Sequence, residues 1–125
     1  MIIIDTSIWI EFFKCNQPYF NHLSDLFEHN EIIALSFIFG ELLQGAKNNH
    51  EKEIIQEFWQ NLPKINEDAI FIKAGLESGR KKWIDKGIGL IDSAIIVASR
   101  ENNLFIWTLD KKIIRLLKNE EIYSL

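Results

Sequence analysis

Cysteine is nearly absent from this sequence, since Cys15 is the only one. A single cysteine cannot form an internal disulfide or supply the thiolate pair of a structural zinc site. The histidines, His22, His29 and His50, have no ligand-like spacing to one another or to Cys15. The sequence therefore predicts a protein of a reducing compartment and argues against zinc.

Proline and glycine are also scarce, with two and six residues among 125. No repeat, linker or low-complexity tract is visible, so we expect residues 1–125 to form a single domain. A hydrophobic content of 47% with 12% aromatic residues is ample for one buried core. These proportions exclude a disordered or fibrous protein.

Long apolar runs and an excess of positive charge are missing as well. No run approaches the roughly 18 residues that span a bilayer. The first residues lack the basic and apolar regions of a signal peptide, so we expect a cytoplasmic protein without membrane contact. The net charge of −4 counts against a stand-alone nucleic-acid binding module.

Positive charge is nevertheless concentrated locally in two clusters. They are Arg80-Lys81-Lys82 with Lys86, and Lys111-Lys112 with Arg115 and Lys118. Each cluster is compatible with a phosphate-binding surface, although a solvated helix face is the commoner explanation of such a pattern.

Strand-like and helix-like segments alternate along the chain. Short apolar runs predict strands at residues 2–5, 31–35, 64–66, 104–109 and 122–125. Helical spacing predicts a first helix capped by Thr6 or Ser7 and running through Phe13, a second after Pro18 that ends near Asn30, and a third at 37–46 capped by Ser36. Further helices are predicted at 50–62, 68–85, 90–102 and 110–119. Within 68–85, the expected buried face is Ile72, Leu76, Gly79 and Trp83. The alternation predicts an α/β fold, a three-layer α/β/α sandwich with a central, mostly parallel sheet.

Four carboxylates stand where an apolar segment ends or on its apolar side: Asp5, Glu41, Asp92 and Asp110. Asp5 and Asp110 each follow an apolar strand, which is where α/β proteins bind ligands. Each is also a good candidate for a helix cap. For Asp5 the capping role and the site role are about equally favourable, and for Asp110 taken alone the capping role is more favourable.

The other two carboxylates lie within predicted helices. Asp92 shares a helix face with Ile95 and Ile96, and Glu41 follows Phe37 by one turn. One inward acid is commonly a satisfied core group, but two such acids together with two at strand ends are hard to explain by packing. The combination favours a functional site.

Converging carboxylates repel one another unless a cation or shared protons neutralise them. Mg²⁺ and Mn²⁺ suit such a set because these hard ions take carboxylate oxygens and retain waters. We therefore predict metal-assisted phosphodiester hydrolysis, in which the ion activates a water. The hydroxyls of Thr6, Ser7 and Thr108 are expected to orient waters or ligands beside it.

These residues lie in four segments that resemble, in order and spacing, the motifs of the PIN-domain ribonucleases, in particular the VapC toxins of bacterial toxin–antitoxin pairs. The segments are Ile4–Ser7, Phe39–Gly45, Gly89–Ala98 and Trp107–Asp110. The fourth departs from the family's pattern, because Lys112 and Ile113 follow where the family often has an acid and then Phe. That departure makes the metal role of Asp110 the least certain of the four.

The resemblance implies that Asp5 and Asp92 are the principal Mg²⁺ ligands and that Glu41 and Asp110 complete the acidic pocket. It also implies an endoribonuclease that cleaves tRNA or ribosomal RNA, a homodimer, and inhibition by a cognate antitoxin whose tail enters a groove near the site. Several aromatic side chains are candidates either for that groove or for the core: Trp9, Phe12, Phe13, Phe37 and Phe39.

Other α/β classes also place an Asp after the first strand. A haloacid-dehalogenase phosphatase needs a second Asp where this chain has Ser7, and a response receiver leaves Glu41 and Asp92 without a role. Gly87-Ile88-Gly89 lies after a helix and lacks the remaining glycine of a dinucleotide-binding motif. Two readings of the PIN resemblance stay open beside the toxin: a catalytically silent module that binds RNA or a partner, and a housekeeping RNA-processing nuclease.

Overall fold

The computed structural model describes residues 1–125 and contains a three-stranded sheet in the order β2-β1-β3. The central strand, β1 (Ile2–Ile4), runs parallel to both β2 (Ile32–Ile33) and β3 (Phe105–Trp107). The backbone N–H of Asp5 donates to the carbonyl of Trp107 at 3.0 Å, which continues the β1–β3 ladder by one residue. A central parallel strand is covered on both faces, which explains why β1 consists of isoleucine only.

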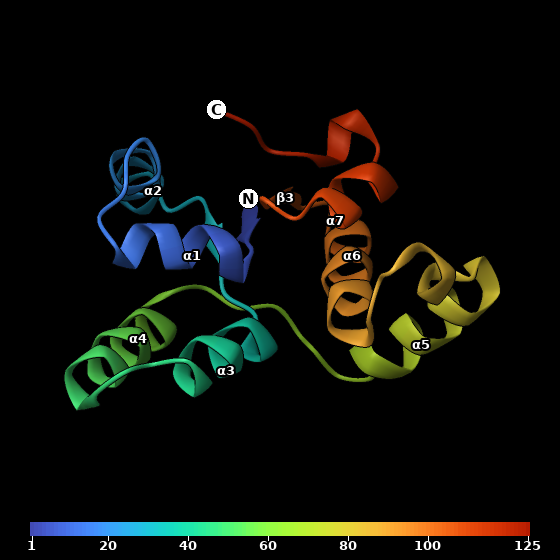
Figure 1. The fold of residues 1–125 in the computed structure, drawn as a ribbon, viewed down its shortest axis with the longest axis horizontal. Coiled ribbons are helices and arrows are strands. Elements are labelled where there is room, and N and C mark those ends of the chain that lie inside the picture. Colours follow the sequence, from blue (N-terminus) through green and yellow to red (C-terminus); the bar gives the residue numbers. More distant parts are fainter.

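Helices cover both faces of this sheet (Figure 1). The α-helices are α1 (Thr6–Phe13), α2 (Tyr19–Glu28), α3 (Ser36–Gln44), α4 (Asn49–Asn61), α5 (Ile70–Lys81), α6 (Leu90–Asn102) and α7 (Lys111–Leu116). Two short 3₁₀ helices are η1 (Trp83–Lys86) and η2 (Asn119–Glu121). In Figure 1, α1 to α4 lie on one side of the strands and α5 and α6 on the other. The predicted α/β class and layered arrangement are confirmed, and no helix is both long and apolar enough to cross a bilayer.

The layer formed by α1 to α4 has an aromatic core centred on Trp9, which is 1% exposed. Its ring lies 5.3 to 5.9 Å, centroid to centroid, from those of Phe12, Phe13, Phe27, Phe39 and Phe58. These rings come from all four helices, so one residue of α1 joins the whole layer. Trp9 is therefore a core residue and not part of a groove.

In the opposite layer, α5 packs on α6 through a different face from the predicted one. Ile72 and Leu76 are 68% and 71% exposed, whereas Ala74 and Ser78 are buried against α6. The predicted face assumed one continuous helix through residue 85, but α5 ends at Lys81 and the next residue is left-handed. The chain reverses there and returns Trp83 to the core from η1, so its burial says nothing about the face of α5.

The predicted cap of α3 is also wrong. Ser36 is the first residue of the helix, and the N-cap position is Leu35, which has no capping side chain. A distant acid supplies the missing acceptor, because Glu67 accepts hydrogen bonds from both the backbone N–H and the hydroxyl of Ser36. Local sequence carries no signal for a cap that comes from 31 residues away.

The two minor strands predicted at 64–66 and 122–125 are reduced to single parallel bridges. Lys64 bridges Ala34, and Ile122 bridges Ile106. The helix predicted at 110–119 ends earlier, at Leu116, and the chain is extended before η2 begins. The extended backbone at these places is real, but neither segment continues far enough along its neighbour to form a strand.

Candidate active site

The carboxyl ends of β1 and β3 meet at one edge of the sheet because the strands are parallel neighbours. Asp5 directly follows β1, and Asp110 lies three residues after β3. The chain continues from the first strand into α1 and from the second into α7, which diverge in Figure 1. The region beyond the carboxyl ends of the strands is the usual ligand site of an α/β sheet.

Asp5 is 7% exposed and has a protein donor on both carboxylate oxygens. Its Oδ1 accepts the backbone N–H of Thr6 at 2.8 Å, so Asp5 caps α1 and the capping interpretation of Asp5 is confirmed. Thr6 and Ser7, also predicted as caps, lie inside the helix. Its Oδ2 accepts the hydroxyls of Thr108 at 2.6 Å and Ser7 at 3.2 Å. Bonds from three directions fix the orientation of this buried carboxylate.

The Thr108 hydroxyl links the two strand ends. It donates to Asp5 and accepts the backbone N–H of Asp110 at 3.0 Å. Asp110 in turn caps α7, since its Oδ1 accepts the backbone N–H groups of Lys112 at 2.8 Å and Ile113 at 3.4 Å. The capping interpretation of Asp110 is therefore confirmed. Both bonds use Oδ1, and Oδ2 is left for another ligand.

Glu41 projects from α3 and is joined to the other acids through α1. The Thr6 hydroxyl donates to Glu41 Oε1 at 3.0 Å. The prediction that Glu41 faces the apolar side of its helix is wrong, because its side chain is exposed while Phe37 and Ile38 are buried. Glu41 instead borders a hollow of about 240 Å³ between α1, α3 and α4.

Asp92 lies in the first turn of α6, half-buried, as the fourth acid of the set. Burial raises the pKa of its carboxyl above the ordinary value, and the nearby charges of Asp110, Asp5 and Glu41 raise it further. The four ion pairs of the structure include none of these acids. The fold thus brings all four predicted acids into one electrostatic neighbourhood without a basic partner.

The PIN domain family matches residues 2–118 of the chain. The chain belongs to the PIN-domain family. Among solved structures, it is similar to a chain in the crystal structure of VapBC2 from Rickettsia felis bound to a DNA fragment from their promoter. The TM-score is 0.72 at 25% identity, over 98% of this chain and 96% of that one. No curated protein matches. The predicted resemblance to VapC-type PIN domains is confirmed.

The donor set of this PIN domain fits a hard divalent ion. It offers four carboxylates and three hydroxyls, and no amine or guanidinium is paired with the acids. The structure contains no group of three or more acids, histidines or cysteines already arranged around one point as metal ligands. An ion that keeps several waters needs only one or two direct carboxylates. Mg²⁺ and Mn²⁺ therefore suit this site better than an ion that requires a complete protein cage.

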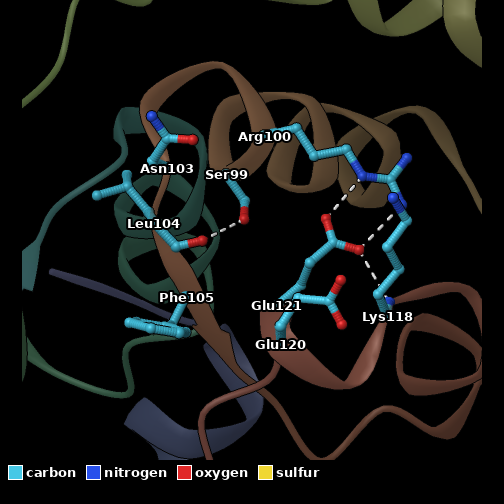
Figure 2. Close-up of a pocket in the computed structure, with 8 residues that line it drawn as sticks. All are labelled: Ser99, Arg100, Asn103, Leu104, Phe105, Lys118, Glu120 and Glu121. Carbon is cyan, nitrogen blue, oxygen red and sulfur yellow. Dashed lines mark hydrogen bonds and ion pairs between the residues drawn. The ribbon is translucent and has the colours of Figure 1, made fainter.

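Figure 2 shows a second hollow of the PIN domain, about 360 Å³, at the other end of α6. Two of its charged groups pair with each other: Arg100 Nε donates to Glu121 Oε2 at 2.8 Å, and Glu121 Oε1 also accepts the backbone N–H of Lys118. Hydrogen bonds from Arg100 hold the pKa of Glu121 below its ordinary value. None of the four acids lines this hollow, so it is not the candidate active site.

The structure brings together cations that the sequence places in two separate clusters. Lys86, Lys112 and Arg115 line a hollow of about 330 Å³. The charge clusters of the sequence assigned Lys86 to the wrong neighbours, because it lies closer in sequence to Arg80 than to Lys112. The available signal in the sequence is the glycine at position 87, because glycine permits a sharp turn. In the structure Gly87 has a left-handed backbone immediately after Lys86.

Proposed function

We propose that this PIN-domain protein is a metal-dependent endoribonuclease and the toxin of a toxin–antitoxin pair. The observation that carries the proposal is the convergence of three acidic charges on the half-buried Asp92 without a basic partner. Such an arrangement costs stability in the metal-free protein and is understandable where a cation is to be bound. PIN domains are generally nucleases, which makes a phosphodiester the expected substrate.

Asp5 and Asp92 are the residues we assign to the ion, Mg²⁺ or Mn²⁺. When bound, such an ion lowers the pKa of a coordinated water and stabilises negative charge on a phosphodiester. Ser7 and Thr108 hold the Asp5 carboxylate in one orientation. Because such supporting bonds keep a ligand in place, they contribute to metal affinity without touching the metal.

Glu41 and Asp110 complete the negative field of the site. Thr6 keeps Glu41 close to the Asp5 turn, and the cap of α7 fixes Asp110 while leaving its Oδ2 free of protein donors. We assign both acids to the orientation of water and substrate around the ion. The substrate class we propose is tRNA or ribosomal RNA, cleaved in the cytoplasm.

The test is cleavage of total cellular RNA by the purified, antitoxin-free protein. With Mg²⁺ or Mn²⁺ we expect discrete fragments, which EDTA abolishes. Asp92→Asn should lower the rate at least ~100-fold, since even outer partners of a metal ligand are typically worth about 10- to 100-fold. Asp25→Asn is the matched control, because Asp25 is an exposed acid of α2 outside the site.

Two outcomes would contradict the proposal. If the folded, metal-supplied protein cleaves no RNA, the catalytically silent binding module becomes the better description. If cleavage is limited to maturation of precursor RNA and expression does not arrest growth, a housekeeping nuclease replaces the toxin. A neighbouring reading frame for a small DNA-binding protein would support the toxin.

The hollow between α1, α3 and α4 is the groove we propose for the antitoxin. Ile10 and Phe13 of α1 face Leu42 across it, and Glu41 stands at its border. An apolar segment of the antitoxin bound there would lie directly beside the acids and obstruct substrate. Ile10→Ser, a change at an exposed residue, should weaken antitoxin binding and leave the melting temperature unchanged. Equal affinity would reject this groove.

A separate apolar surface is the face we propose for homodimer formation. It consists of exposed large side chains on α5, η1 and the start of α6: Phe71, Ile72, Leu76, Ile84 and Leu90. Exposed apolar groups of this size in one part of a small protein are typical of an interface. Leu76→Glu should convert the dimer to a monomer in light scattering, whereas Ile10→Ser should not. A wild-type monomer at high concentration would contradict the proposal.

A further inference from the structure

Three cations from two separate segments line one hollow of about 330 Å³. Lys86 ends η1, and Lys112 and Arg115 lie three residues apart on α7. All three side chains are exposed. We call these three residues the basic pocket.

The turn at Gly87 holds the pocket together. Its φ of 79° is left-handed, and the side chain of Lys112 crosses directly over it. A Cβ at Gly87 would lie 3.1 Å from Lys112 Cδ and 3.5 Å from Lys112 Nζ. Glycine at this position therefore allows the ammonium of Lys112 to approach the chain just after Lys86.

The three cations of the basic pocket gather without an acidic partner, unlike the neighbouring cations of α5. Arg80 and Lys81 both pair with Glu77, at 2.8 and 3.0 Å. Lys73 and Arg100 also have carboxylate partners, whereas the four ion pairs include no residue of the basic pocket. Like charges that gather without compensation are unfavourable, which is the expected situation where an anion is bound.

The basic pocket is connected to the acids through the backbone on both sides. The Lys112 N–H donates to Asp110 Oδ1 at 2.8 Å. On the other side, Gly87 begins the short connection to α6, whose first turn carries Asp92. Along the chain, Lys112 thus follows Asp110 by two residues and Lys86 precedes Asp92 by six.

A nucleic acid that approaches four carboxylates on a protein of net charge −4 is repelled unless local positive charge receives its backbone. We propose that Lys86, Lys112 and Arg115 bind a backbone phosphate of the RNA substrate, adjacent to the phosphodiester that is cleaved. This inference rests on the proposed function, which it deepens. The pocket's lining has only one apolar residue, Leu116, which favours a phosphate over an apolar protein segment.

The test compares two neutralised proteins in an Asp92→Asn background, where RNA is not cut. One carries Lys86→Gln, Lys112→Gln and Arg115→Gln; the control carries Arg80→Gln and Lys81→Gln, which removes cations already paired with Glu77. The probe is a fluorescently labelled, mixed-sequence single-stranded RNA in Mg²⁺. Fluorescence anisotropy gives the affinity as a function of salt concentration.

For the basic-pocket variant we expect affinity to fall at least ~10-fold and the salt dependence to become shallower. The plot of log K against log salt has a negative slope, and each lost phosphate contact reduces the magnitude of that slope by about 0.7 for a single strand. The control should keep the affinity and slope of its parent. Both variants should keep the melting temperature of their Asp92→Asn parent, because the substituted lysine and arginine side chains are all exposed.

Three results would overturn the inference. The first is equal affinity of the basic-pocket variant and its parent, and the second is an equal loss in the control, which would indicate net charge alone. The third is weakened antitoxin binding with unchanged RNA binding, which would assign the pocket to an acidic protein segment. If the wild type cleaves RNA in any of these cases, the assignment of the basic pocket to phosphate binding fails and the proposed ribonuclease function stands. Absence of both cleavage and RNA binding would reject the proposed function with it.

Discussion

Helix α6 has a charged site at each end, and the two ends are built in opposite ways. At its start, burial raises the pKa of Asp92, and the charges of Asp110, Asp5 and Glu41 raise it further. At its end, Arg100 binds Glu121, and the guanidinium lowers the pKa of that carboxyl. Both ends contain acids of similar chemistry, so the difference lies in their partners.

The comparison separates a structural charge from a functional one. A carboxylate beside a guanidinium and a backbone N–H, as at Glu121, stabilises the folded chain. Carboxylates that repel one another without a basic partner, as near Asp92, destabilise the metal-free protein and are retained where a ligand supplies the missing charge. The charges at the hollow in Figure 2 are therefore explained by stability, whereas the acids near Asp92 require a function.

The largest expected difference between the two ends of α6 is in RNA cleavage, when one hydroxyl group is removed near each end. Thr108→Val removes the group that bonds both Asp5 and the Asp110 backbone, and should lower RNA cleavage about 10- to 100-fold. Ser99→Ala removes a hydroxyl that donates to the Leu104 carbonyl at the other end, and should leave cleavage unchanged. Initial rates with Mg²⁺ measure both. Equal activity of the two variants would show that Thr108 does not support the site.

The next effect is a loss of stability at the paired end. Glu121→Gln should lower the free energy of unfolding by roughly 1–2 kcal/mol at pH 7, since the Arg100 and Glu121 side chains are only 30% and 14% exposed. Because folding lowers the pKa of Glu121, its stabilisation is present above the ordinary value of 4.5 and disappears as the pH falls through the folded-state pKa. Urea unfolding at several pH values should show the wild type and variant converging in acid. A constant difference would exclude the ionised pair as the cause.

Several parts of this structure follow from the sequence because they depend on local rules. Parallel strands align their carboxyl ends, so the acids after 2–4 and 105–107 had to meet at one edge. Asp110 before Lys111 is a recognisable helix cap, and its role in α7 is confirmed. Asp5, Asp92 and Asp110 are likewise recognisable by their positions at the ends or on the apolar side of apolar segments, whereas Glu41 lies on an exposed face of its helix and not on the predicted apolar face.

The remainder depends on contacts between distant residues. Glu67 replaces the predicted cap of Ser36, and Lys82 ends α5 so that Leu76 faces outward. Glu41 has buried neighbours on its helix, but the exposed rim it occupies is created by packing against α1 and α4. Lys86 joins α7 only through the turn that follows it. The periodicity of a single sequence does not specify such contacts between distant residues.

The smallest expected effect is on the stability of the metal-free protein. Neutralising the acid at the start of α6 should stabilise the fold, whereas neutralising Glu121 should destabilise it. Asp92→Asn removes a half-buried charge that three acids disfavour, so the metal-free protein should become more stable by about 1 kcal/mol. A change of that size corresponds to a rise of roughly 4 °C in melting temperature for a domain of this length. Mg²⁺ should raise the melting temperature of the wild type and leave that of the variant unchanged, because a bound ligand stabilises only the state that binds it. Thermal unfolding with and without EDTA measures both shifts. A less stable metal-free variant would mean that Asp92 is held by favourable contacts, and the two ends of α6 would then be alike.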